Sequence, residues 1–184
     1  MYRGQFDKAL ELAQKSIAID PVDPSAYAWL ATIYYFAGKY PEALAANRKM
    51  FDLDPGADRH YHRQVAFVLL AKGDAAAALS EIDSDKGIRE NCPCLVIAYD
   101  NLGRKAEADA ALANFKKLDA AGNAYFIGLV YANRGDADQA FTWFDRAYRQ
   151  HQSELFYLNI SPFTKNVRSD PRFNALRRKL DLLD

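Results

Sequence analysis

The residues best suited to chemistry lie in a short aromatic and basic stretch near position 60. His60, Arg63 and Phe67 are spaced i, i+3 and i+7, so a helix would place two hydrogen-bond donors and an aromatic ring on one face. Such a face suits a peptide that carries an acidic group. His60 and His62 are two residues apart, so a helix would point them to different faces, and we expect no shared metal ion.

The sequence motifs of common enzymes and cofactor sites do not occur. The sequence has no glycine-rich phosphate loop and no nucleophile-elbow pattern, and His151 is isolated. Cys92 and Cys94 flank Pro93; a disulfide between residues two apart would be strained, and one such pair supplies only two of the four ligands that zinc needs. We therefore expect two small buried apolar residues here, and we predict no enzyme, no metal site and no cofactor.

Composition narrows the class of protein. The 184 residues are half hydrophobic, and 24 Lys and Arg balance 24 Asp and Glu, so the formal net charge is zero. A zero balance argues against a chain built as a whole to coat nucleic acid. No apolar run approaches the roughly 18 residues of a membrane span, and the first residues do not have the pattern of a signal peptide.

An internal repeat supplies the elements that must position these side chains. Glycine recurs at steps of 34, 35, 30 and 32 residues, and alanine follows each glycine five residues later. The glycines are Gly4, Gly38, Gly73, Gly103 and Gly135, and the alanines are Ala9, Ala43, Ala78, Ala108 and Ala140. Large residues lie four and eight positions before the later glycines, which predicts one apolar stripe on a helix.

Each repeat has the signals of a helical hairpin. Glycine ends the first helix because it tolerates the left-handed conformation, and alanine lets the second helix approach closely. The pairs Asp20-Pro21 and Asp54-Pro55 stop the second helix, because proline cannot continue it. One such hairpin cannot bury its apolar face alone, whereas stacked hairpins bury it together.

These residues resemble the tetratricopeptide repeat family. Ala26–Pro55 and Ala124–Tyr148 carry its signature residues, among them Leu30, Tyr34 and Gly38 in the first segment. Gly4–Pro21 is half a repeat, and the third and fourth repeats, about 59–84 and 89–119, are degenerate, with Pro93 shortening a helix. The resemblance implies an all-α, right-handed superhelix of about five helix-turn-helix repeats over residues 1–151.

The last 33 residues, 152–184, depart from the repeat and predict a separate capping segment. Ser161-Pro162 and Asp170-Pro171 each look like an N-cap followed by proline at the first helical position. From Pro171 onward, one helix face carries Phe173, Leu176, Leu180 and Leu183. We expect this helix to cover the last repeat, with Arg172, Arg177, Arg178 and Lys179 in solvent, and we predict no nucleic-acid partner.

The sequence "SDPRF" at Ser169–Phe173 resembles a tail that closes tetratricopeptide regions in bacterial multidomain regulators, although Val167 replaces the usual leucine. Those proteins place the repeats after a cyclase, winged-helix or kinase domain. The resemblance implies a regulatory or assembly module of a larger bacterial signalling protein. We expect a cytoplasmic location, with the periplasmic side of a membrane-anchored regulator as the alternative.

The first helix of each repeat should also present a stripe to the concave side of the array, where we predict that a protein or peptide binds. The predicted groove residues are Trp29, Thr32, Phe36, His60, Arg63, Phe67, Leu70, Asp100, Tyr125 and Asn133. Packing on a neighbouring helix is an equal alternative for Trp29. The groove could instead serve a small-molecule sensor or an enzyme, or hold the chain's own C-terminal segment through Phe156, Tyr157 and Phe163.

The N-terminal half repeat predicts a second contact surface. Its helix has an apolar stripe of Phe6, Leu10 and Ile17 but no preceding helix to pack against. Terminal repeats normally present a polar outer face. We therefore expect this stripe to mediate self-association or to lie against other protein, and we interpret the chain as the C-terminal part of a longer one.

Overall fold

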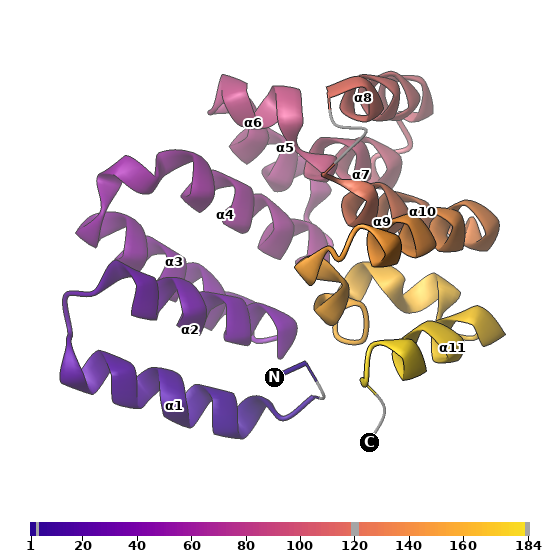
Figure 1. The fold of residues 1–184 in the computed structure, drawn as a ribbon. Helices are drawn as coiled ribbons and strands as arrows, with labels where there is room; N and C mark the ends of the chain where they lie inside the picture. Colours follow the sequence, from indigo (N-terminus) through magenta and orange to yellow (C-terminus); the bar gives the residue numbers. More distant parts are fainter. Residues whose placement is uncertain (3, 119–121, 183–184) are drawn as a thin grey trace. The chain divides into compact units, whose positions relative to one another are not determined.

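The computed structural model describes residues 1–2, 4–118 and 122–182. Most of these residues belong to helical hairpins (Figure 1). The described residues contain helices and no strand, as an all-α repeat fold requires. They divide into two compact units, residues 4–89 and 90–182, which we call the N-terminal and the C-terminal unit.

The N-terminal unit contains the half repeat and two complete hairpins. Its elements are α1 (Phe6–Ile19), α2 (Pro24–Phe36), α3 (Tyr40–Leu53), the 3-10 turn η1 (Pro55–Ala57), α4 (Asp58–Lys72) and α5 (Ala75–Asp83). α2 pairs with α3 and α4 with α5, while α1 packs on α2 and α3 on α4. Helix α6 (Lys86–Asn91) crosses the boundary between the two units.

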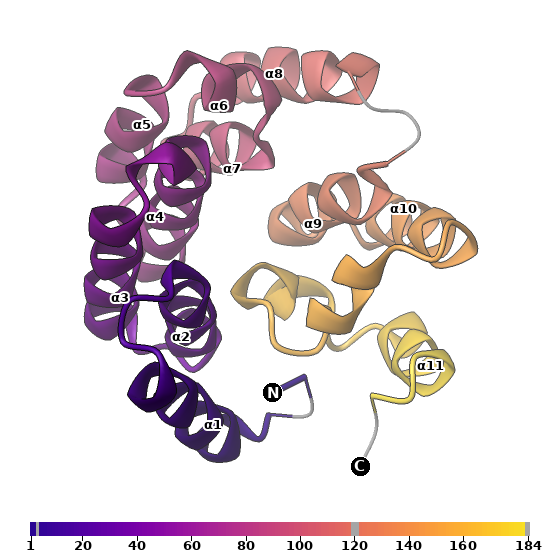
Figure 2. The same ribbon diagram turned by 60° about the vertical axis from the view of Figure 1, so that its left-hand side comes forward.

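The C-terminal unit contains two further hairpins and a tail. Its elements are α7 (Pro93–Asn101), α8 (Lys105–Leu118), α9 (Ala124–Arg134), α10 (Ala137–Arg149), the 3-10 helices η2 (Ser153–Tyr157) and η3 (Pro162–Val167), and α11 (Pro171–Lys179). α7 pairs with α8 and α9 with α10, and η3 packs on α9 (Figure 2).

The predicted turn signals act as expected. Gly73 and Gly135 end α4 and α9 in the left-handed conformation, with φ of 92° and 79°, a region that costs other residues steric strain. The next residue caps the following helix: the Asp74 carboxylate accepts from the Ala77 amide at 3.1 Å, and Asp136 does the same for Gln139. The Asp-Pro pairs follow the ends of α1 and α3.

Small residues set the spacing within each hairpin. The repeat alanines Ala43, Ala78, Ala108 and Ala140 are fully buried. At Gly128 in α9 an added Cβ would lie 2.6 Å from the Phe144 ring and 3.2 Å from the Ala140 carbonyl oxygen. The close crossing of α9 and α10 therefore requires glycine, where the second repeat tolerates Ala31.

Helix α7 begins at Pro93, as the sequence indicates, with Cys92 as its N-cap residue. Both cysteines are buried, which confirms that part of the expectation. The expectation that they are not bonded is wrong, because a disulfide joins Cys92 and Cys94. Their side chains meet where the chain enters the helix, so the short separation in sequence does not prevent the bond.

The predicted capping helix is present as α11. The Asp170 carboxylate accepts from the Arg172 amide at 2.9 Å, and Phe173 and Leu176 are buried. The helix is shorter than predicted: it ends at Lys179, and Leu182 follows as a buried residue. Leu180 is half-buried, and the predicted contact of Leu183 lies outside the described residues.

Candidate functional site

Two helices of the N-terminal unit present most of the predicted groove residues. The face of α2 carries Trp29, Thr32 and Phe36, and the face of α4 carries His60, Arg63 and Phe67. The side chain of Gln64 joins the two helices, since its Nε2 donates to Thr32 Oγ1 at 3.4 Å and lies 3.0 Å from His60 Nε2. We call this surface the α2–α4 face, defined by Trp29, Thr32, Phe36, His60, Arg63, Gln64 and Phe67.

The predicted groove residues of the N-terminal unit differ in how much of each side chain is exposed. Trp29 is 54% exposed, an unusually large exposed fraction for an indole, and Arg63 is also exposed. Thr32, Phe36, His60 and Phe67 are half-buried. The prediction for Leu70 is wrong, because it is 3% exposed and belongs to the core of the unit. Sequence reasoning missed Gln64, although its spacing of four residues from His60 places it on the same helix face.

The charge of the α2–α4 face comes from Arg63. Burial, and secondarily the nearby Arg63 guanidinium, lower the pKa of His60 below its usual value of 6.5. The imidazole is therefore neutral at pH 7 and can both donate and accept a hydrogen bond. The face thus combines aromatic surface, an amide, a hydroxyl and a neutral imidazole with a guanidinium.

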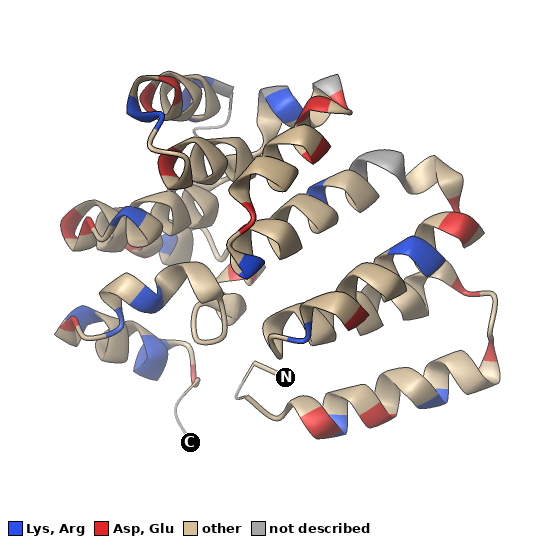
Figure 3. Ribbon diagram, turned by 180° about the vertical axis from the view of Figure 1, so that it is seen from behind, with Lys and Arg blue, Asp and Glu red and all other residues tan. Residues whose placement is uncertain are grey.

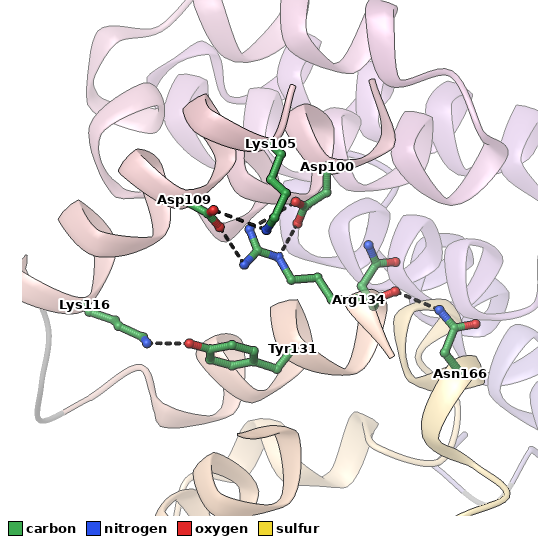
Figure 4. A network of polar contacts seen from close by, with 8 residues as sticks. Asp100, Lys105, Asp109, Lys116, Tyr131, Arg134 and Asn166 are labelled. Carbon is green, nitrogen blue, oxygen red and sulfur yellow. Dashed lines mark hydrogen bonds and ion pairs between the residues drawn. The ribbon is translucent and has the colours of Figure 1, made fainter. Parts of the chain in front are cut away.

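In the C-terminal unit, Asp100 takes part in an ion-pair network instead of facing a ligand. Arg134 of α9 donates to both Asp100 carboxylate oxygens, at 2.7 and 3.0 Å, and also contacts Asp109 of α8 at 3.0 Å (Figure 4). Lys105 contacts Asp109 from the same helix. Because Asp100 and Arg134 are both largely buried, this network joins the fourth and fifth repeats. Asp100 is therefore engaged within the chain.

The chain itself covers the corresponding face of α9. Tyr125 is 3% exposed, and this burial raises the pKa of its hydroxyl above the usual value, although the hydrogen bond between the hydroxyl and the Ser161 side chain acts in the opposite direction. The Tyr125 amide donates to Gln152 Oε1 at 2.9 Å. Asn166 Nδ2 donates to the Asn133 carbonyl oxygen at 2.7 Å (Figure 4). The prediction of Tyr125 as a ligand contact is wrong, because the C-terminal segment lies over it.

The segment that covers α9 uses different anchors from those expected. Leu155, Leu158, Phe163 and Val167 are buried. Phe163 is thus an anchor, as the sequence suggested, whereas Phe156 is 42% exposed and is not one. Tyr157 is half-buried. The face of α9 is therefore occupied, whereas on the α2–α4 face Trp29 and Arg63 stay exposed.

The apolar stripe of α1 is oriented differently from our expectation. The helix packs on α2, and the stripe of Phe6, Leu10 and Ile17 is half-buried around Ala13, which is 8% exposed. The stripe is thus partly covered within the chain, and self-association through it stays a prediction. The exposed large apolar residues of this end lie elsewhere: Leu12 is 58%, Ile19 85% and Val22 69% exposed.

The two neighbouring histidines point to different partners, as their spacing predicts. His60 contacts Gln64 on α4, whereas His62 Nδ1 lies 2.6 Å from Glu81 Oε1 and 3.2 Å from Ser84 Oγ. Within the described ranges, no group of three or more His, Cys, Asp or Glu side chains is arranged to hold a metal ion. In the same part of the chain, no helix has the length and apolarity needed to cross a bilayer.

Comparison with known proteins identifies the family. Tetratricopeptide repeat models match residues 1–66, which contain α1–α3 and most of α4, and residues 95–154, which contain α8–α10 and most of α7. The chain therefore belongs to the tetratricopeptide repeat family. Repeats of this family generally mediate protein–protein interaction or scaffolding and are generally non-catalytic. Comparison of the whole chain with curated proteins gives no match.

Proposed function

We propose that the α2–α4 face binds a peptide, or a segment of a partner protein, that carries an acidic group. The observation that carries this proposal is the exposed indole of Trp29 on the same face as the exposed guanidinium of Arg63. Tryptophan and arginine are the side chains that most often dominate binding energy at protein interfaces. Covering the exposed half of an indole contributes about 2–3 kcal/mol at roughly 25 cal/mol per Å2.

The polar groups of the face suit a peptide backbone. Thr32, His60 and Gln64 supply a hydroxyl, a neutral imidazole and an amide along the line where α2 meets α4. These groups can pair with the N–H and C=O groups of a bound segment, and Arg63 can pair with a carboxylate. The aromatic rings of Trp29, Phe36 and Phe67 on the same face can supply apolar contact.

We further propose that the chain serves as the regulatory or assembly module of a larger bacterial signalling protein. The support is the resemblance of Ser169–Phe173 to the tail of such regulators, together with the role of Asp170 as the N-cap of α11. A cytoplasmic location is part of this proposal and rests on the same resemblance.

Selection from a displayed library of random peptides tests the binding proposal. We expect the protein to enrich peptides that combine an acidic residue with large apolar residues. The double variant Trp29→Ser/Arg63→Ser should bind the selected peptides at least tenfold more weakly by calorimetry, which is about 1.4 kcal/mol. Phe156→Ser, at an exposed aromatic of the C-terminal unit, is the matched control and should bind normally. Peptides that bind the double variant and the unmodified protein equally would place recognition elsewhere.

A further inference from the structure

Two arginines of the C-terminal tail lack an acidic partner within the described part of the chain. Arg168 follows η3, and Arg177 lies in α11. Figure 3 shows basic residues, in blue, on α11 and on the segment that leads into it. Arg172 contacts the carboxylates of Asp138 and Asp170, whereas neither Arg168 nor Arg177 forms an ion pair with any described residue. The positive charges of these two side chains are therefore not offset by the residues around them.

Hydrogen bonds hold the Arg168 guanidinium in one orientation. Its Nη2 donates to the Ser161 carbonyl oxygen at 2.8 Å, and its Nε donates to Thr164 Oγ1 at 3.4 Å. Ser161 and Thr164 are 2% and 0% exposed, so both acceptors belong to a well-packed part of the tail. These acceptors carry no charge, so they position Arg168 without neutralising it. A side chain that is already ordered loses little entropy when it binds a ligand.

Arg177 brings a second guanidinium close to the first. Although much of Arg168 is exposed, partial burial and then the positive charge of Arg177 lower the pKa of Arg168 below its usual value. The two like charges therefore repel each other in the folded chain. An anion bound by both would replace this repulsion with two attractions.

The Arg177 side chain also has a hydrogen-bond donor that is not used. Its Nε is buried and has no acceptor among the described residues, an arrangement that costs stability. Its Nη1 donates to Asn174 Oδ1 at 3.2 Å, and Asn174 is exposed on the same helix. Because this contact is with an exposed amide, Arg177 can exchange it for an anion and turn its Nε–H toward the same ligand.

We propose that Arg168 and Arg177 together bind the phosphate group of a phosphate monoester. Such a group carries about −1.5 to −2 charges at pH 7 and three acceptor oxygens, which match two uncompensated guanidinium groups. Each guanidinium can donate two parallel N–H···O bonds to phosphate oxygens. A carboxylate offers only one charge and two oxygens. The phosphate can belong to a modified side chain of a partner protein or to a small phosphorylated molecule.

A titration with inorganic phosphate at constant ionic strength, followed by NMR of the arginine Nε–H groups, tests the site. We expect the Arg168 and Arg177 signals to shift together, with a dissociation constant on the order of 1 mM. Arg177→Gln should weaken binding at least tenfold, and so should Arg168→Gln, which provides a second variant if the first does not fold.

Arg178→Gln is the matched control, because it makes the same change of charge at an exposed neighbouring position. It should bind phosphate as the unmodified protein does. Equal weakening by Arg177→Gln and Arg178→Gln would show a general effect of net charge and would overturn the proposal. Acetate binding as strongly as phosphate, or Arg168 and Arg177 signals that do not move in about 20 mM phosphate, more than ten times the expected dissociation constant, would overturn it too.

The proposed peptide site of the N-terminal unit does not enter this inference. The variant Trp29→Ser/Arg63→Ser should bind phosphate with unchanged affinity, and a loss of binding in it would place the anion on Arg63 instead. In that variant, a short peptide with one phosphoserine identifies the source of the phosphate. Binding at least tenfold tighter than inorganic phosphate would support a modified protein, and equal binding would support a small phosphorylated molecule.

Discussion

At the scale of single residues, Asn47 is the clearest departure from an apolar repeat core. It is fully buried in α3, and neither its Nδ2 nor its Oδ1 has a hydrogen-bond partner. The corresponding positions of other repeats carry Ile82, Leu112 and Phe144, all buried. A buried polar group without a partner costs about 1–3 kcal/mol.

Replacing this amide by an apolar side chain of similar volume should stabilise the protein. We expect Asn47→Leu to raise the free energy of unfolding by about 1–3 kcal/mol in urea titrations. Asn101→Leu makes the same chemical change at an exposed position and should stay within about 0.5 kcal/mol of the unmodified protein. A destabilised Asn47→Leu variant would show that the amide has a partner such as bound water.

His60 should make the stability of the protein depend on pH. Its pKa in the folded state is lower than its usual value of 6.5, first through burial and then through Arg63. The unfolded chain therefore binds a proton more readily than the folded one, so the contribution of neutral His60 is present above pH 6.5 and is lost as the pH falls below it. Thermal midpoints measured between pH 7.5 and 5 should fall more steeply for the unmodified protein than for His60→Gln. Parallel curves would contradict the assignment, because His62 is common to both proteins.

Helical spacing predicted the exposure of a side chain where one helix alone sets the face. Trp29 and Arg63 lie exposed on the faces that the spacing gave them. Leu70 and Tyr125 follow the same spacing but are buried. For Tyr125 the reason is a contact with Gln152 and Ser161, residues 27 and 36 positions later in the chain, and helical periodicity contains no information about such contacts.

At the scale of elements, the hairpin boundaries were predictable because glycine, proline and capping residues act locally. Gly73 and Gly135 end their helices, and Asp170 begins α11. The faces of α1 were not predictable in the same way. The stripe with the best helical period is half-buried, and the exposed apolar residues of the helix, Leu12 and Ile19, lie outside that stripe.

The burial of Phe173 in α11 leads to a prediction at this scale. Phe173 is 3% exposed, whereas Arg178 is exposed. We expect Phe173→Ala to destabilise the protein by about 3–5 kcal/mol, as large-to-small changes in a core do. Arg178→Ala should change the free energy of unfolding by less than about 0.5 kcal/mol. An unchanged thermal midpoint for Phe173→Ala would mean that the helix does not stabilise the repeats.

At the scale of the whole molecule, acidic residues offset the positive charge of the C-terminal tail. The 24 basic and 24 acidic residues cancel formally, and the two kinds are interspersed along the helices (Figure 3). In the tail, Arg172 contacts the carboxylates of Asp138 and Asp170, and Arg168 donates to the Ser161 carbonyl oxygen. Arg168 and Arg172 of the tail are therefore engaged in contacts within the chain.

This balance predicts weak binding to DNA. Non-specific complexes draw their affinity from counterions released by several basic side chains, and their dissociation constants are typically 10⁻⁴–10⁻⁶ M at physiological salt. With opposing carboxylates close to its arginines, this chain should bind a labelled 20-base-pair duplex more weakly than about 100 µM at 150 mM salt in fluorescence anisotropy. The variant Asp138→Asn, which removes one of the two carboxylates that Arg172 contacts, should bind more tightly, because it releases positive charge to the phosphates. Tight binding by the unmodified chain, with a steep decline as salt rises, would instead make the basic tail a nucleic-acid contact.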